Sequence, residues 1–263
     1  GKKEEVKKVE WKASAQAGII STTGNSRATS GAAGAKASRK DGTNKLSMAA
    51  SAAYARSSIL IAVDNGNGLI EPWEVSRSTS TTTRAWAFKG RYDRFLTKHN
   101  SLYATASVSG DKPAGKEFVG GGQAGYSRQL FKDKEHEVVA EAGYDFSYED
   151  PVVGDGVSIH SARFFVGYEG ALTKDTGLTG SLESLHNVNS LDTSNGEVSA
   201  FEDTRINTSL AITTKLFKDI SFRFGHIVKW DNAPSARPLI GGLPYVDGYS
   251  PLAAKLDTKT EAT

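Results

Sequence analysis

The sequence contains no cysteine, which excludes disulfide frameworks, cysteine-based metal sites and thiol nucleophiles. It also has no long apolar run, since the longest, from Ile59 to Val63, is far shorter than the roughly 18 residues that a spanning helix needs. Hydrophobic residues make up 38% of the 263 residues, below the ordinary globular range of about 45–50%. A helical membrane protein is therefore excluded, but a membrane barrel needs apolar residues only at every second position.

An excess of charge of one sign is also lacking. The chain has 32 Lys and Arg against 30 Asp and Glu, a formal net charge of +2. This balance lacks the basic footprint of a nucleic-acid-binding protein, so we expect no nucleic acid among the partners. The five histidines are scattered along the chain rather than clustered as metal ligands, and we expect no cofactor.

What the sequence does have is a period of two. From Trp11 to Ile19 the odd positions are apolar and the even positions are polar or glycine. The same alternation returns in the segments 81–97, 134–149, 157–173, 203–217 and 219–231. A period of two is typical of strands that present one face to an apolar medium and the other to water.

Twelve strands follow from this pattern, with connections that alternate in length. We predict the strands near residues 9–23, 26–40, 44–58, 81–97, 99–110, 117–131, 134–149, 157–173, 177–188, 203–217, 219–231 and 255–263. Even-numbered strands are followed by tight turns. Odd-numbered strands are followed by longer connections, the longest being 59–79, 189–202 and 231–254, and only the first odd connection, Thr23–Asn25, is short. Short turns on the periplasmic side and long loops outside are typical of outer-membrane barrels.

The predicted fold class is therefore all-β: a single transmembrane antiparallel up-and-down β-barrel of about 12 strands over residues 9–263, behind a charged periplasmic leader at 1–8. A secreted β-sandwich or a soluble ligand-binding barrel would also alternate. Two features favour the membrane barrel. The polar row repeatedly carries charge, and the strands exceed the usual length of about 5–6 residues in globular sheets.

The two rows of side chains predict two surfaces. The row expected to face the lumen carries the charged residues Lys89, Arg91, Glu137, Glu141, Asp145, Arg163, Glu169, Glu183, Arg205 and Arg223. The row expected to face lipid carries the aromatic residues Trp11, Trp86, Phe88, Tyr144, Phe146, Phe164, Tyr168, Phe222 and Trp230. The mixed signs in the lumen fit either a charged pore or a salt-bridge network that fills it, with Glu141, Glu169 and Glu183 near Arg163.

Part of the outward row consists of alanine. These residues are Ala13, Ala15, Ala17, Ala33, Ala35, Ala50, Ala52, Ala104, Ala106 and Ala124. Small residues let a second surface approach closely in membranes, so this alanine-rich face is a hypothetical docking surface for an envelope protein. The alternative is that alanine simply tolerates lipid, and outer-membrane lipid and lipopolysaccharide are the partners expected over the rest of the outside.

Two segments match the patterns of functional sites only in part. Asn65, Asn67 and Glu74 occupy positions 3, 5 and 12 of a calcium-loop pattern, but Val63 stands where the first aspartate belongs, so an Asn/Gly-rich turn is the alternative and no metal is assigned. Ser184 and His186 point the same way on one predicted strand, but no third group or oxyanion donor accompanies them. We therefore predict no catalytic residues and no enzyme.

Several short motifs resemble those of a known family. The stretch Val9–Gly18, followed by Ser21–Ser26, resembles the opening of the YdiY-like family of salt-induced outer-membrane proteins, as do the later segments Arg91–Arg94, Gly120–Tyr126 and Glu141–Tyr144. The resemblance runs from about Val9 to Phe146, and the insert 59–79 departs from it. It implies an outer-membrane β-barrel of a Gram-negative bacterium and implies little about activity.

Alternation, loop lengths and resemblance together predict a protein of the bacterial outer membrane. We expect porin-like permeation of small solutes through the barrel. The alternative is a non-conducting structural barrel that docks partners in an envelope complex. The apolar, Gly- and Pro-containing segment 231–254 is expected to fold over the mouth, to enter the lumen or to bind a partner outside.

Overall fold

The computed structural model of the chain describes residues 9–23, 27–152, 154–193, 196–218, 220–233 and 256–262. Twelve strands form one antiparallel sheet: β1 (Val9–Thr22), β2 (Arg27–Asp41), β3 (Asn44–Ala62), β4 (Val75–Phe95), β5 (Asn100–Asp111), β6 (Lys116–Lys132), β7 (His136–Pro151), β8 (Val157–Ala171), β9 (Thr176–Asn187), β12 (Thr204–Phe217), β13 (Ile220–Asp231) and β14 (Leu256–Ala262). Each strand pairs with the next sheet strand along the chain, so the predicted all-β class and antiparallel order are confirmed.

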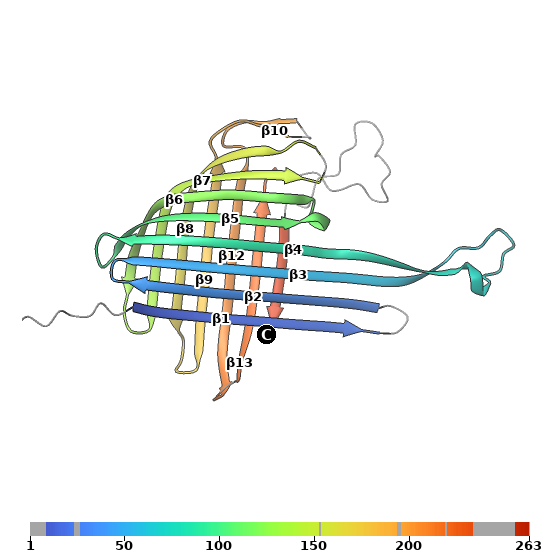
Figure 1. Cartoon of the computed structure of the whole chain (residues 1–263), viewed down its shortest axis with the longest axis horizontal. Helices are drawn as coiled ribbons and strands as arrows, with labels where there is room; N and C mark the ends of the chain where they lie inside the picture. The colour runs from blue at the N-terminus through green and yellow to red at the C-terminus, as the bar shows by residue number, and fades with distance from the viewer. Residues whose placement is uncertain are drawn as a thin grey trace, which may run out of the picture.

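The sheet curls, and the curl gives it an inner and an outer side. Strands β8, β9, β12 and β13 pass behind β1–β4 at a steep angle (Figure 1). On the concave side, side chains reach across two intervening strands: Arg91 of β4 meets Glu141 of β7, and Arg163 of β8 meets Tyr103 of β5. We call the side on which these residues lie the inner face and the opposite side the outer face.

Burial on the two faces is the reverse of that in a β-sandwich. The buried polar residues outnumber the buried apolar ones; they are Asp93, Ser101, Thr105, Ser127, Glu141, Asp145, Ser161, Arg163, Asn187 and Asp203. Large apolar side chains instead lie exposed on the outer face, as Trp11 (70% exposed) and Phe164 (54% exposed) illustrate. The polar row of each strand thus faces the concave side, and the apolar row faces outward.

A pair of glycines keeps the centre of the inner face open. Gly125 of β6 lies directly opposite Gly143 of β7. A Cβ atom added to either would lie 2.8 Å or 2.6 Å from the hydroxyl oxygen of Tyr103, and 2.4 Å from a backbone oxygen of the neighbouring strand. The ring of Tyr103 therefore reaches across β6 and β7 only because both positions lack a side chain.

The connection predicted at 59–79 is shorter in the structure, because strand pairing continues into it. Ile59 pairs with Ser78 and Ala62 with Val75, which leaves residues 63–74 as the loop, with the 3-10 turn η1 (Pro72–Glu74) at its end. The added stretch of β4, residues 75–80, is rich in Ser, and its β-branched Val75 and Thr79 suit a strand that pairs with the apolar Ile59–Ile61.

One further loop differs from the prediction, and two predicted segments lie outside the described residues. The connection 189–202 contains a small hairpin of β10 (Leu191–Thr193) and β11 (Gly196–Val198), whose strands are too short to produce a periodic signal. The predicted leader 1–8 lies outside the described residues, as does the predicted loop 231–254 beyond Ala233. Helical structure in the described part is limited to the turns η1 and η2 (Lys112–Ala114), and neither is long or apolar enough to cross a membrane.

Asn187, at the end of β9, anchors the loop that leads to β12. Its side chain is fully buried. The Nδ2 group donates to the carbonyl oxygens of Asn189 (2.8 Å) and Ser199 (3.0 Å), and Oδ1 accepts from the backbone N–H of Asp203 (3.0 Å). One side chain therefore satisfies three backbone groups of a segment that has few ladder hydrogen bonds of its own.

Replacing Asn187 with alanine is expected to lower the free energy of unfolding by about 3 kcal/mol, because buried backbone groups lose their partners. Denaturant titration of the full chain measures this loss. Asn67→Ala is the matched control, because the exposed Asn67 side chain accepts only a local hydrogen bond from the backbone of Leu69. Equal losses in the two variants would contradict the anchoring role of Asn187.

Candidate functional site

The centre of the inner face is occupied by a connected set of polar side chains. Glu141 of β7 receives two arginines: Arg91 of β4 donates to both of its carboxylate oxygens (2.6 and 3.1 Å), and Arg163 of β8 donates to Oε2 (2.8 Å). Arg91 also donates to Asp93 on its own strand (2.7 Å). Paired N–H groups of a guanidinium match the two oxygens of a carboxylate, which fixes the orientation of both groups.

Arg163 extends this set towards the later strands. Its Nε group donates to Glu183 of β9 (2.6 Å), and Glu183 in turn accepts from Asn207 of β12 (3.1 Å). The hydroxyl of Tyr103 accepts from Arg163 (2.9 Å), and the guanidinium of Arg91 lies 4.4 Å from the centre of the Tyr103 ring. We call Arg91, Asp93, Tyr103, Glu141, Arg163, Glu183 and Asn207 the central network.

Burial makes the central network costly to break. Glu141 is 7% exposed and Arg163 only 3% exposed. Moving a charge of either sign out of water costs several kcal/mol unless it is paired and hydrogen-bonded. Glu141 meets this condition with its two arginines, and Arg163 meets it with two carboxylates and a phenol. The network therefore holds β4, β5, β7, β8, β9 and β12 in one mutual arrangement.

A second polar cluster lies where the same strands end. Arg205 of β12 donates to Glu149 of β7 (3.2 Å) and lies 3.6 Å from Asp203, and Lys116 of β6 also donates to Glu149 (3.2 Å). Asp203 precedes β12 and is 3% exposed. Its burial, opposed by the neighbouring Arg205 guanidinium and reinforced by the acidic Asp231, raises the pKa of Asp203 to about 6.

The charged residues predicted for the lumen all lie on the inner face, but they do not form one group. Arg91, Glu141, Arg163 and Glu183 meet in the central network, and Arg205 belongs to the second cluster. The others lie apart: Asp145 accepts from Gln123, Glu137 from Lys132 and Gln129, Arg223 donates to Thr213, and Lys89 and Glu169 are exposed.

The expected pairing of Glu169 with Arg163 is wrong. The two residues are six positions apart on β8, which separates them by roughly 20 Å along the strand. Glu169 instead lies opposite Glu137 of β7 and Thr179 of β9. The expected pairing of Arg163 with Glu141 and Glu183 is confirmed. Each glutamate lies on an adjacent strand, two residues from the position directly opposite Arg163.

The aromatic residues predicted to face lipid lie on the outer face. Trp11, Trp86, Phe88, Tyr144, Phe146, Phe164 and Phe222 are exposed there, and Tyr168 and Trp230 are half-buried. Tyr168 bonds to Nδ1 of His136 (2.8 Å). The rows of alanine lie on the same face; Ala15, for example, is paired with Ala35, which is paired with Ala50.

The loop that resembles a calcium site uses its oxygens internally. Asp64 accepts from the backbone N–H groups of Gly66 (2.9 Å), Asn67 and Gly68, and these bonds, that of Gly66 foremost, lower the pKa of Asp64. Glu74 accepts from the backbone of Asn65 (2.8 Å) and of Glu71. Among the described residues no group of three or more His, Asp or Glu side chains is arranged to hold a metal.

Ser184 and His186 form a hydrogen-bonded pair on the outer side of β9. The distance from Ser184 Oγ to His186 Nε2 is 2.7 Å, and Nδ1 of the same ring lies 3.2 Å from the hydroxyl of Thr204. Thr204 is a third group that sequence reasoning missed. It is neutral, and the backbone N–H groups around the pair are engaged in the ladders with β8 and β12, so the arrangement lacks an acid and an oxyanion site.

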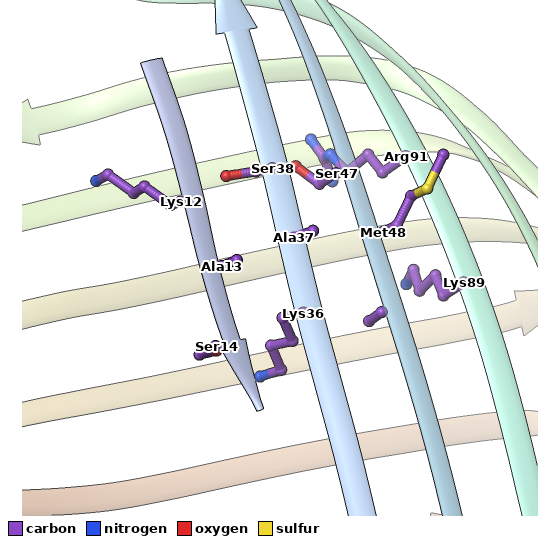
Figure 2. A pocket seen from close by; sticks show the side chains of 11 residues that line it. Lys12, Ala13, Ser14, Lys36, Ala37, Ser38, Ser47, Met48, Lys89 and Arg91 are labelled. Carbon is purple, nitrogen blue, oxygen red and sulfur yellow. The ribbon is translucent and has the colours of Figure 1, made fainter. Parts of the chain in front are cut away.

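Two features of the inner face were not predicted. One is Tyr103, the aromatic residue at the centre of the network. The sequence feature that could have revealed it is an aromatic residue in the polar row, between Ser101 and Thr105. The other is a cavity of about 420 Å³ against β1–β4, shown in Figure 2. It is lined by Lys12, Ala13, Ser14, Lys36, Ala37, Ser38, Ser47, Met48, Ala49, Lys89 and Arg91.

Replacing Glu141 with glutamine is expected to lower the free energy of unfolding by about 2–4 kcal/mol, because two inner-face arginines lose a shared counter-charge. Glu137→Gln is the control on the same strand and face, since Glu137 is paired with the half-exposed Lys132 and should lose less than about 1 kcal/mol. Equilibrium unfolding of both variants checks this. Similar losses would show that the central network is not what holds the strands together.

The raised pKa of Asp203 predicts a pH dependence of stability. An unfolded aspartate has a pKa of about 3.9, so as the pH falls from 7 through 6 the folded chain takes up this proton first and gains stability relative to the unfolded chain. Asp203→Asn removes this gain. The free energy of unfolding of wild type relative to the variant should therefore rise by on the order of 2 kcal/mol between pH 7.5 and 4.5. A difference that does not change with pH would refute the assignment.

Comparison with known proteins places the chain in a family. No curated protein matches it. The model of the family described as "Protein of unknown function, DUF481" matches residues 15–238, a range that runs from within β1 through β13 and includes the central network and all residues of the cavity lining except Lys12, Ala13 and Ser14. A match over this much of the sequence is sufficient to conclude that the chain belongs to the DUF481 family.

Proposed function

We propose that this chain is an integral β-barrel of the bacterial outer membrane that allows small solutes to permeate as a porin does. The observation that carries the proposal is the inverted burial. An exposed belt of Trp, Phe, Tyr and Leu side chains on the outer face would be an aggregation hazard in water, whereas hydrocarbon solvates it. The buried polar row opposite would line an aqueous interior.

Closure of the sheet between β1 and β14 is part of this proposal. In the described ladders β1 pairs only with β2, and β14 only with β13. An edge strand in hydrocarbon would leave a row of N–H and C=O groups unpaired, at several kcal/mol each, so a sheet of this kind in a membrane must close on itself. A closed barrel of twelve strands would have a lumen whose width lies between that of small filled barrels and that of the 16–18-stranded porins.

The lengths of the connections support an orientation. Gly42 and Thr43 suffice to join β2 to β3, and residues 133–135 join β6 to β7. At the opposite end, residues 63–74 and 188–203 form longer connections with their own short elements. In the proposal the tight turns face the periplasm and the longer loops face outward. The resemblance to YdiY-like outer-membrane proteins supports the same location.

One observation favours the alternative of a non-conducting structural barrel. The central network joins β4 to strands that lie beyond β5 and β6, and so places side chains across part of the inner face. In this alternative the network fills the lumen, and the alanine-rich part of the outer face docks an envelope protein. The cavity against β1–β4 favours permeation instead, because it leaves space beside the network.

Single-channel recording in planar bilayers separates the two functions, and the absence of native cysteine allows a site-directed form of it. Wild type should show steady conductance steps. Ser38→Cys places a thiol at the cavity, and a bulky methanethiosulfonate reagent should reduce its conductance. Ala35→Cys, on the outer side of the same strand and not among the residues that line the cavity, is the matched control and should not respond.

Silent bilayers that contain folded protein would overturn the permeation proposal and favour the structural barrel. An equal block of the two cysteine variants would show that the solute path does not follow the inner face of β2. Steps in wild type together with a block of Ser38→Cys alone are the result that we expect.

A further inference from the structure

We infer that the cavity on the inner face of β1–β4 is a binding site for small oxyanions that carry two or more negative charges, such as polycarboxylates and phosphates. The inference deepens the proposed function, on which it rests for the claim that the bound anion is also the solute that permeates. Binding itself requires only the inner face as the structure has it.

Strand register places the cations of the cavity in two parallel rows. In one row Lys12, Ser38, Ser47 and Arg91 lie directly opposite one another on β1, β2, β3 and β4. In the next row Ser14, Lys36, Ala49 and Lys89 do the same. Neighbouring rows on one face are about 7 Å apart, and the side chains of Lys and Arg can span that distance. Each row therefore offers two cations with at least one serine hydroxyl.

The rows on either side leave the three lysines of the cavity without a paired acid, although Asp93 in one of these rows is bonded to Arg91. The row below contains Glu10, Lys40, Lys45 and Asp93, two acids and two bases. The row above contains Gln16, Gly34, Ser51 and Ala87, none of them charged. On β5 the residues opposite Arg91 and Lys89 are Thr105 and Ser107. The cavity thus holds three lysines without a carboxylate in its own two rows, beside Arg91, whose charge is already paired with Asp93 and Glu141.

The lysines are free to bind a ligand, whereas three acids of the inner face are already paired with arginines. Lys12, Lys36 and Lys89 are exposed to the enclosed space and form no ion pair or side-chain hydrogen bond with any residue that the structure describes. Glu141, Glu149 and Glu183 are each bonded to an arginine. The uncompensated charge of this region is therefore positive.

The arrangement selects among small solutes. Ammonium groups and hydroxyls donate hydrogen bonds, and charge-assisted bonds to carboxylate or phosphate oxygens are the strong ones. Figure 2 shows Lys89 extending from β4 towards β3, and Lys36 extending from β2 towards β1. Cations spread over several strands favour an anion with more than one charged group. A volume of about 420 Å³ is within the usual range of ligand pockets, about 300–1,000 Å³.

The experiment is isothermal titration of the full detergent-solubilised chain with citrate and with inorganic phosphate, and with sucrose as a neutral solute. Citrate and phosphate should bind and sucrose should not. The double variant Lys36→Gln, Lys89→Gln should weaken citrate binding by about tenfold or more, because two charge-assisted contacts are lost. Lys215→Gln is the matched control, because Lys215 is an exposed inner-face lysine of β12 outside the cavity and should leave binding unchanged.

Absence of citrate binding, or equal binding by wild type and the double variant, would overturn the inference. A second measurement, the reversal potential under a KCl gradient, connects the site to permeation: wild type should prefer chloride, and the double variant should shift towards potassium. Citrate binding without conductance would support the site and reject permeation. Conductance without citrate binding would support permeation and reject the site.

Discussion

The carboxylate of Glu141, held between the guanidinium groups of Arg91 and Arg163, is the interaction on which the inner face depends. It neutralises two arginines that would otherwise lie beside each other, and it ties β7 both to its neighbour β8 and to the more distant β4. Tyr103 fits between the same two arginines because Gly125 and Gly143 leave room for its ring. Electrostatic pairing and the curl of the sheet therefore support each other.

A polar interior changes how the fold is stabilised. The apolar residues that the described part of the chain buries are few: Tyr103, Ile159, Leu185, Leu191 and Ala211. The hydrophobic effect cannot supply its usual share through a core of that size. The long antiparallel ladders supply backbone hydrogen bonds, and the exposed aromatic row gains stability only from an apolar surrounding. This is the physical reason for proposing that the chain lies in a membrane.

Charge is distributed unevenly over the inner face. Glu141 of β7 and Glu183 of β9 are each bonded to an arginine, while the lysines of β1, β2 and β4 face open space. In the proposed barrel, this separation of charge would produce a field across the lumen that acts on a charged solute. Because the acids that hold the strands together are paired with arginines, they do not pair with the lysines of β1, β2 and β4. Those lysines are therefore available to a ligand.

The sequence by itself determined the strands, their order and the two faces, because side chains alternate with a period of two and short turns impose nearest-neighbour pairing. It therefore also predicted that Glu141 and Glu183 would meet Arg163 from the adjacent strands. Only the tertiary structure decided which residues meet across the inner face: the contact of Arg91 with Glu141, the position of Tyr103 and the cavity beside Lys36 all depend on the curl. Curvature is a collective property of twelve twisted strands, and no local pattern of residues encodes it.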